Sequence, residues 1–241
     1  MKNKRLILIT NDDGIRAEGL VRLVQAAVKF GEVWVVAPDK QQSGMSHSLM
    51  LTEPLTSKEV DFPVAGVRAF CTNGTPSNCV SLGIHAILPE IPDVVLAGIN
   101  MGYNIATDIQ YSGTVGAALE AAVQDVHAIA ISQGIKGSFE LIDHYLEEIL
   151  EDLIDRKIGR DQVWNVNFPE CRLDECKGVK ADCRVYKENF YKDEYVPEKI
   201  SEDGTVTYKT IFARDWKGTE GTDIDAVINN YIAVGIVTNL R

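Results

Sequence analysis

The chain has 241 residues, of which 45% are hydrophobic and 24% are charged, proportions that exclude a disordered, collagenous or coiled-coil protein. Its 24 lysines and arginines against 35 aspartates and glutamates give a net charge of −11, which disfavours binding to nucleic acid or to an anionic membrane. The five cysteines are an odd number without a C-x-x-C pair, and no apolar run approaches the roughly 18 residues of a membrane span. We therefore expect a soluble, cytoplasmic protein.

Short apolar segments alternate with segments of helical period over the first two-thirds of the chain. The expected strands are residues 5–10, 32–37, 67–71, 93–97, 128–132 and 163–167, and the expected helices are residues 17–30, 77–88, 112–124 and 139–156. Strands without polar alternation, each followed by a helix, are typical of a parallel sheet that is covered on both faces. The pattern therefore predicts a doubly wound α/β fold.

The pattern changes between Cys171 and Asp215, where charged, tyrosine and β-branched residues dominate. With turn signals at Glu202–Asp203–Gly204, this segment is interpreted as antiparallel hairpins that project from the main body and could form an oligomer arm. A helix over 222–230 and a strand over 231–238 are expected to follow. Without a repeat or a linker, residues 1–241 are expected to form a single domain.

Four polar residues, Asn11–Asp12–Asp13–Gly14, follow the first expected strand. Ligands of open parallel sheets bind beyond the carboxyl ends of the strands, and two adjacent carboxylates repel each other unless a cation lies between them. The segment therefore fits a divalent cation held by oxygen atoms, Mg²⁺ or Mn²⁺. It fits equally well a turn that caps the following helix, and from these four residues both interpretations stay open.

Two later loops also follow expected strands. In Ala37–Leu49, Ser43 could offer a hydroxyl to a metal or a phosphate, although a serine- and glycine-rich loop usually carries no chemistry. Farther on, Ser112 is suited to cap the helix over 112–124, and Gly113 lets a ligand approach the free amides of the first turn. This would be an anion site without a lysine or arginine, and an ordinary capped helix is the structural alternative.

The segments LILITNDDG, APDKQQSG, NGTPSNCV, PDVVLAGINMGYN and DIQYSGTVGAALEA occur in this order along the chain. Together they resemble the SurE family of metal-dependent 5′-nucleotidases, the stationary-phase survival proteins, and WNVNFP and GTDIDAV resemble its later motifs. The resemblance implies a Rossmann-like phosphatase that uses a divalent metal to remove phosphate from nucleoside 5′-monophosphates. It also implies a homodimer or homotetramer. Activity on 3′-monophosphates and short polyphosphate stays open.

Carried across motif by motif, the resemblance implies one divalent cation per subunit, Mg²⁺ or Mn²⁺, with four ligands: Asp12, Asp13, Ser43 and Asn100. It implies that Asn11 joins Asp12 and Asp13 as catalytic residues, and that phosphate is bound by Asn100, Ser112, Gly113 and Thr114. The chain departs from the family pattern at four positions, none of them an implied ligand. Gln42 replaces an arginine, Ser46 and Ala106 replace glycines, and Asn239 replaces a proline.

The residues leave the mechanism open, because either a water or one of the aspartates could attack phosphorus. A haloacid-dehalogenase-type phosphatase would have Asp-x-Asp after the first strand, whereas this chain has Asp12–Asp13. A receiver-type signalling module would need a later acceptor aspartate and a lysine, which the chain does not present convincingly. A nucleotide-binding regulator without catalysis is the remaining alternative, although every implied metal ligand is present.

Overall fold

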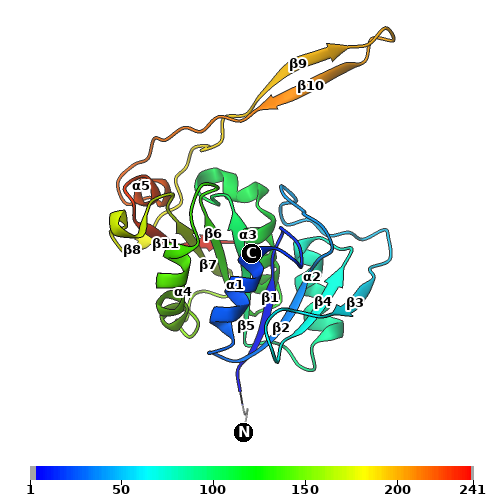
Figure 1. Ribbon diagram of the computed structural model, residues 1–241, viewed down its shortest axis with the longest axis vertical. Helices are drawn as coiled ribbons and strands as arrows, with labels where there is room; N and C mark the ends of the chain where they lie inside the picture. The colour runs from blue at the N-terminus through cyan, green and yellow to red at the C-terminus, as the bar shows by residue number, and fades with distance from the viewer. Residues whose placement is uncertain (1–3, 240–241) are drawn as a thin grey trace.

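The computed structural model describes residues 4–239, and their centre is a twisted sheet of nine strands. In the order in which they lie side by side, the strands are β3 (Ser57–Val60), β4 (Arg68–Thr72), β2 (Glu32–Pro38), β1 (Leu6–Thr10), β5 (Val94–Met101), β6 (His127–Gln133), β7 (Gln162–Phe168), β11 (Ile232–Thr238) and β8 (Val179–Cys183). Figure 1 shows β1 starting on the side of the amino-terminal end of the chain, at the bottom of the view.

The strands from β4 to β7 are all parallel, whereas β3 is antiparallel to β4 and β11 is antiparallel to β7. The chain builds outward from β1 to β2 and β4, and then returns to β5 and builds in the other direction. The predicted doubly wound, Rossmann-like fold is therefore confirmed. Its switch point lies between β1 and β5, where ligands of such sheets bind.

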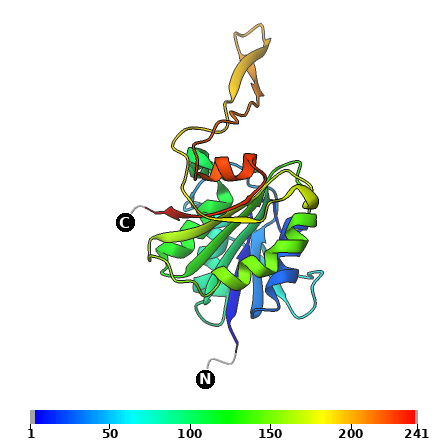
Figure 2. The ribbon, with the colours of Figure 1, turned by 90° about the vertical axis from the view of Figure 1, so that its left-hand side faces the viewer.

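Helices cover both faces of the sheet, as the continuous apolar strands predict. Helices α1 (Glu18–Ala27) and α4 (Glu140–Leu153) pack on one face, and α2 (Pro76–Leu82) and α3 (Gly113–Val123) pack on the other. Figure 2 looks from the β8 edge and shows the two layers. Along β1, Ile7 and Ile9 face the first layer while Leu6 and Leu8 face the second. No helix within residues 4–239 is long and apolar enough to cross a bilayer.

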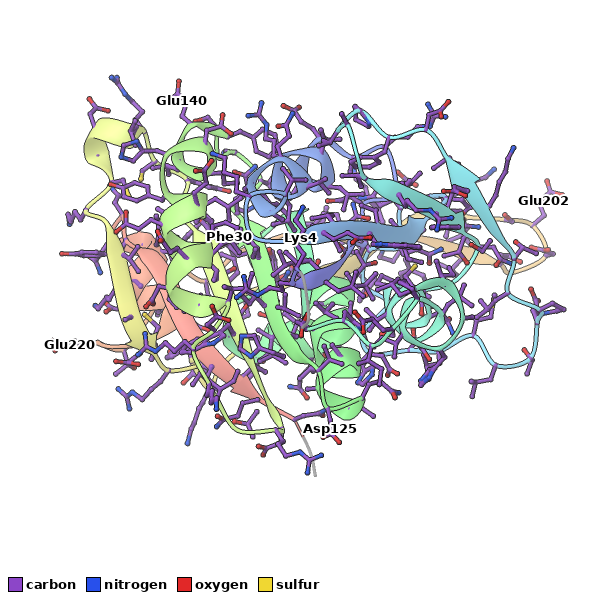
Figure 3. The ribbon with its side chains drawn as sticks, turned by 90° about the horizontal axis from the view of Figure 1, so that it is seen from below. Lys4, Phe30, Asp125, Glu140, Glu202 and Glu220 are labelled. Atoms are coloured by element: carbon purple, nitrogen blue, oxygen red, sulfur yellow. The ribbon has the colours of Figure 1, made fainter. Side chains whose placement is uncertain are left out.

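The projecting excursion is confirmed as one hairpin, β9 (Glu194–Ile200) and β10 (Val206–Ile211), which stands far out from the body (Figure 1). The range predicted for hairpins is too wide, because β8 lies within it and instead extends the main sheet, parallel to β11. The hairpin leaves from the carboxyl ends of the strands. Figure 3 views the opposite end, where Lys4 and Phe30 lie near the starts of β1 and β2.

Two expected elements differ in detail. The helix expected over 77–88 is α2 followed by a π-helix over Gly83–Ile87, and its start is fixed by a capping box between Thr75 and Asn78. The strand expected over 93–97 continues to Met101 as β5. A 3₁₀-helix over Ala106–Tyr111 then leads into α3. A shorter one covers Leu173–Glu175.

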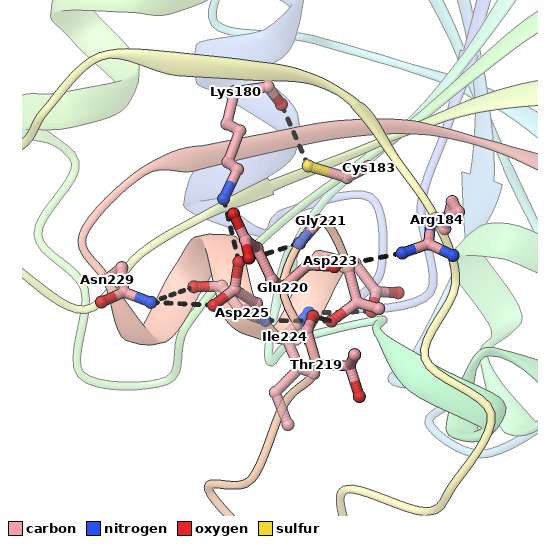
Figure 4. Close-up of polar contacts among 11 residues, drawn as sticks. Lys180, Cys183, Arg184, Thr219, Glu220, Gly221, Asp223, Ile224, Asp225 and Asn229 are labelled. Atoms are coloured by element: carbon pink, nitrogen blue, oxygen red, sulfur yellow. Dashed lines mark hydrogen bonds and ion pairs between the residues drawn. The ribbon is translucent and has the colours of Figure 1, made fainter.

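The motif GTDIDAV forms the start of α5 (Asp223–Ile228), the helix expected over 222–230. Figure 4 shows how its acidic residues are used: Asp225 pairs with Lys180 of β8 at 2.9 Å and accepts a hydrogen bond from Gly221. Asp223 is buried and accepts hydrogen bonds from the backbone amides of Ala106 and Tyr186 at 2.9 and 3.1 Å. The motif therefore ties the 3₁₀-helix before α3 to the segment that leads to the hairpin.

Candidate active site

The turn after β1 is shaped by Asn11. Its side-chain oxygen accepts a hydrogen bond from the amide of Gly14 at 3.2 Å, and its side-chain nitrogen donates to the carbonyl of Gly14 at 3.0 Å. Gly14 has a φ of 99°, which a residue with a side chain rarely adopts. Asn11 is fully buried, and these contacts are those of a residue that holds the turn carrying Asp12 and Asp13. Its catalytic role stays a prediction.

Asp12 lies against the first turn of α3. Its Oδ1 accepts a hydrogen bond from the hydroxyl of Thr114 at 2.6 Å, and this bond lowers the pKa of Asp12. A Cβ on Gly113 would lie 3.2 Å from Oδ2 of Asp12, so glycine lets the helix approach this closely. Ser112 caps the helix as predicted, because its hydroxyl accepts from the amide of Val115 at 3.0 Å. The anion at this helix start is therefore the Asp12 carboxylate.

The two aspartates are close together in a poorly solvated place. Burial raises the pKa of Asp12 to about 6, and the neighbouring charge of Asp13 contributes to this rise. The hydrogen bond from Thr114 acts in the opposite direction and lowers the pKa. Burial also raises the pKa of Asp13, which accepts hydrogen bonds from the amide of Met101 and from Gln41, both at 3.3 Å. A bound cation would favour the charged form of both carboxylates.

The loop after β2 brings Ser43 to the aspartates. Gln41 donates from one side-chain nitrogen to the hydroxyl of Ser43 at 3.0 Å and to Oδ1 of Asp13. The amide of Gln42 donates to the carbonyl of Asp12 at 2.7 Å, so this position contributes through its backbone. The loop is therefore fastened directly to the turn after β1.

The far end of the same loop is fastened to α3. The amide of Ser46 donates to the carbonyl of Tyr111 at 3.1 Å, and the imidazole Nε2 of His47 lies 2.7 Å from Oε2 of the buried Glu120. Ser46 has a φ of 55°, and Ala106, the second position where the family pattern has glycine, has a φ of 57°. Both residues thus adopt the left-handed conformation that glycine tolerates without strain.

Asn100, on β5, completes the group. Its side-chain nitrogen donates a hydrogen bond to the carbonyl of Gly102 at 2.9 Å. The side-chain oxygen is therefore the atom of Asn100 that could coordinate a cation. A cavity of about 700 Å³ at the switch point is lined by Asp12, Ser43, Asn100 and Ser112 together. Gly113 and Thr114 lie behind Asp12 and hold it. The structure therefore brings together residues that are distant in sequence, and their roles stay a prediction.

The donor set fits the expected metal. Within residues 4–239, the structure shows no group of three or more His, Cys, Asp or Glu side chains that could hold a metal ion. A metal at Asp12 and Asp13 would therefore also need neutral oxygen ligands. Asp12 and Asp13 would supply the charge, and Ser43 and Asn100 would supply a hydroxyl and an amide oxygen. Oxygen-only ligation suits Mg²⁺ or Mn²⁺ rather than zinc.

Sequence reasoning assigned no role to two groups that the structure places at the site. Asp108 is buried, lines the cavity, and accepts hydrogen bonds from the amides of Phe190 and Tyr191. Tyr195 and Phe212, at the root of the hairpin, line the same cavity. The high tyrosine content near residue 190 is a sequence signal, but nothing local shows that this segment returns to the carboxyl ends of the strands.

A doubly wound sheet with an acidic turn and a helix start at its switch point defines a Rossmann-like α/β protein with a ligand site between β1 and β5. The chain belongs to the SurE family: the family model described as "Survival protein SurE" matches residues 7–192. This match confirms the resemblance seen in the motifs.

Relatives and a solved structure agree with this membership. The chain is 38% identical to a 5′-nucleotidase SurE of Mesorhizobium japonicum over 237 residues, which cover 95% of this chain and 91% of the relative. It is 36% identical to a 5′-nucleotidase SurE of Clostridium botulinum, over 95% of this chain and 90% of the relative. The crystal structure of the SurE protein from Aquifex aeolicus superposes with a TM-score of 0.81 at 37% identity and covers 97% of this chain and 93% of its own.

Proposed function

We propose that the protein is a metal-dependent phosphomonoesterase that hydrolyses nucleoside 5′-monophosphates to nucleoside and phosphate. One observation carries the proposal: Asp12, Ser43, Asn100 and Ser112 come from four separate segments and line one cavity at the switch point. Relatives that align over nine-tenths of this chain are named 5′-nucleotidases. Activity on 3′-monophosphates and on short polyphosphate is a further part of the proposal.

In this proposal Asp12, Asp13, Ser43 and Asn100 hold one divalent cation, Mg²⁺ or Mn²⁺. When bound, the cation supplies the positive charge that offsets a dianionic phosphate in a protein of net charge −11, and it activates the attacking group. Thr114 orients the Asp12 carboxylate through its hydroxyl at 2.6 Å.

The protein's own residues would hold the phosphate next to that carboxylate. Asn100 and Ser112, which line the cavity, would contact the phosphate where negative charge builds up on its oxygens. Gly113 and Thr114 would complete the phosphate site from behind Asp12, at the start of α3. Asn11 keeps both aspartates in place through its two hydrogen bonds to Gly14. The attacking group is a water or one aspartate. A single turnover in ¹⁸O-labelled water tests for the aspartate, because an aspartyl phosphate that is cleaved at its carbonyl carbon would place the label in the enzyme carboxylate.

We further propose that the enzyme works in the cytoplasm as a single-domain subunit of a homodimer or homotetramer. Strands from residues 6 to 238 share one sheet, which supports the single domain. Hairpin β9–β10 exposes apolar side chains that a partner subunit could cover: Val196, Ile200 and Ile211. The five cysteines are all free, which suits a reducing compartment. Light scattering of the purified protein measures the oligomer.

Phosphate release tests the activity. Nucleoside 5′- and 3′-monophosphates and short polyphosphate are compared with Mg²⁺, Mn²⁺ or EDTA, for wild type, Asp12→Asn and Asp39→Asn. Asp39 is exposed and follows β2 directly, so its variant removes an equal charge close to the site. We expect metal-dependent release that Asp12→Asn abolishes and Asp39→Asn retains. A folded wild type that binds nucleotide but releases no phosphate with any metal would instead indicate a nucleotide-binding regulator.

A further inference from the structure

The cavity has a second part that the proposed metal and phosphate chemistry does not use. Its lining there is aromatic, and we call it the aromatic wall: Tyr111, Tyr191, Tyr195 and Phe212. Tyr111 precedes α3, whereas the other three come from the root of hairpin β9–β10. Tyr195 and Phe212 are 71% and 78% exposed, so most of their surface is open to a ligand.

The root of the hairpin is fixed to the body next to the cavity. The buried Oδ2 of Asp108 accepts hydrogen bonds from the amides of Phe190 and Tyr191, at 2.5 and 2.9 Å. The hydroxyl of Tyr191 donates to the carbonyl of Tyr103 at 3.3 Å. The ring of Phe190 packs edge to face on Tyr103 and on Trp216, with centroids 5.9 and 5.0 Å apart. The segment that carries Tyr191 therefore leads into β9 from a position that these contacts fix.

We propose that the aromatic wall binds the nucleoside part of the substrate, with the base stacked on a ring of the hairpin root. The inference rests on the proposed function, because the phosphate end of the substrate is taken to lie at Asp12 and Ser112. A volume of about 700 Å³ suits a ligand of nucleotide size. Aromatic rings stack on every base, since each base has a π-face. The wall therefore predicts an enzyme that accepts purine and pyrimidine nucleotides but favours them over phosphate esters without a base.

Two ring deletions and a matched control test the wall. Phe212→Ala and Tyr195→Ala remove wall residues, whereas Tyr208→Ala removes an exposed ring of β10 that does not line the cavity. The readout is kcat/KM for adenosine 5′-monophosphate divided by kcat/KM for ribose 5-phosphate, which has the same phosphoester without a base. We expect this ratio to fall about fivefold to tenfold, through KM, in each wall variant. It stays at the wild-type value in Tyr208→Ala.

The outcomes separate the wall from the proposed activity. An unchanged ratio in both wall variants, or an equal loss on both substrates, overturns the wall as a base site. Calorimetric titration with adenosine needs no catalysis, and we expect weaker binding in the two wall variants alone. A wild type that hydrolyses neither substrate, yet binds adenosine through these rings, would refute the phosphatase and retain the wall. A wild type that hydrolyses both substrates equally well would retain the phosphatase and refute the aromatic wall as a base site.

Discussion

Replacing Thr114 by valine isolates one contact of the candidate metal centre. Thr114 is fully buried and its hydroxyl donates to Oδ1 of Asp12 at 2.6 Å, whereas valine has nearly the same shape and keeps the backbone amide. A hydrogen bond to a charged group contributes about 1.5–3 kcal/mol. Losing it also raises the pKa of Asp12 further above its present value of about 6, because this bond lowers that pKa. Both effects weaken a cation site, by about 10- to 100-fold in affinity.

Calorimetric titration with Mn²⁺ and kcat/KM for a nucleoside 5′-monophosphate measure the loss. Because protons compete better for Asp12 in Thr114→Val, its activity should also need a higher pH than that of the wild type. Thr114→Ser is the matched control, since it restores the hydroxyl and should regain most of the affinity. If the valine variant folds and equals the serine variant in Mn²⁺ affinity and in kcat/KM, Thr114 does not orient a metal ligand, and the assignment of Asp12 loses its support.

Three further changes follow from particular contacts. Gly113→Ala places a Cβ 3.1 Å from the Cβ of Asp12 and 3.2 Å from Pro76. Because this contact would displace the Asp12 carboxylate, we expect kcat/KM to fall at least about tenfold. Circular dichroism checks that the variant still folds. Ser46 adopts a left-handed conformation, which costs a residue with a side chain about 1–2 kcal/mol of stability. Ser46→Gly removes this strain but also makes the unfolded chain more flexible. Denaturant titration should therefore show that the free energy of unfolding rises by about 0.5–1 kcal/mol. Burial lowers the pKa of His127, so the folded state binds fewer protons there than the unfolded state as pH falls below the ordinary value of 6.5. Wild type should therefore lose more unfolding free energy than His127→Asn between pH 7.5 and pH 5.5.

A strand or helix could be predicted from the sequence wherever the pattern of apolar residues within that element reflects how it is buried. β1 is buried at every position because both faces are covered, and its apolar run from Leu6 to Ile9 was found at once. β3 was missed, since three of its four residues, Ser57–Val60, are exposed and it is held mainly by pairing with β4. β8 was assigned to the hairpin region for a related reason. Its parallel pairing with β11 joins segments about fifty residues apart, which no local pattern reveals.

The sequence indicated which residues could form the candidate site, but not how their side chains contact one another. Asn11 to Gly14 admitted a metal site or a helix-capping turn, and the structure shows why the residues alone did not decide. Asn11 and Gly14 do form a tight turn, while Asp12 lines the cavity. The contact that distinguishes Asp12 comes from Thr114, 102 residues away. It depends on the order of β1 and β5 in the sheet and not on the spacing of residues near Asp12.

The start of α3 also contributes differently from the simple anion site that its sequence predicts. The amide of Val115 donates to the hydroxyl of Ser112, and the hydroxyl of Thr114, in the first turn, donates to Asp12. Much of the positive end of the helix dipole therefore stabilises a buried carboxylate, which allows the two adjacent acids to stay charged. In the proposed enzyme, a phosphate would then draw most of its neutralising charge from the cation that those acids are proposed to hold. The helix start and the metal centre thus form one electrostatic unit, and the loss of either should weaken phosphate binding by a common route.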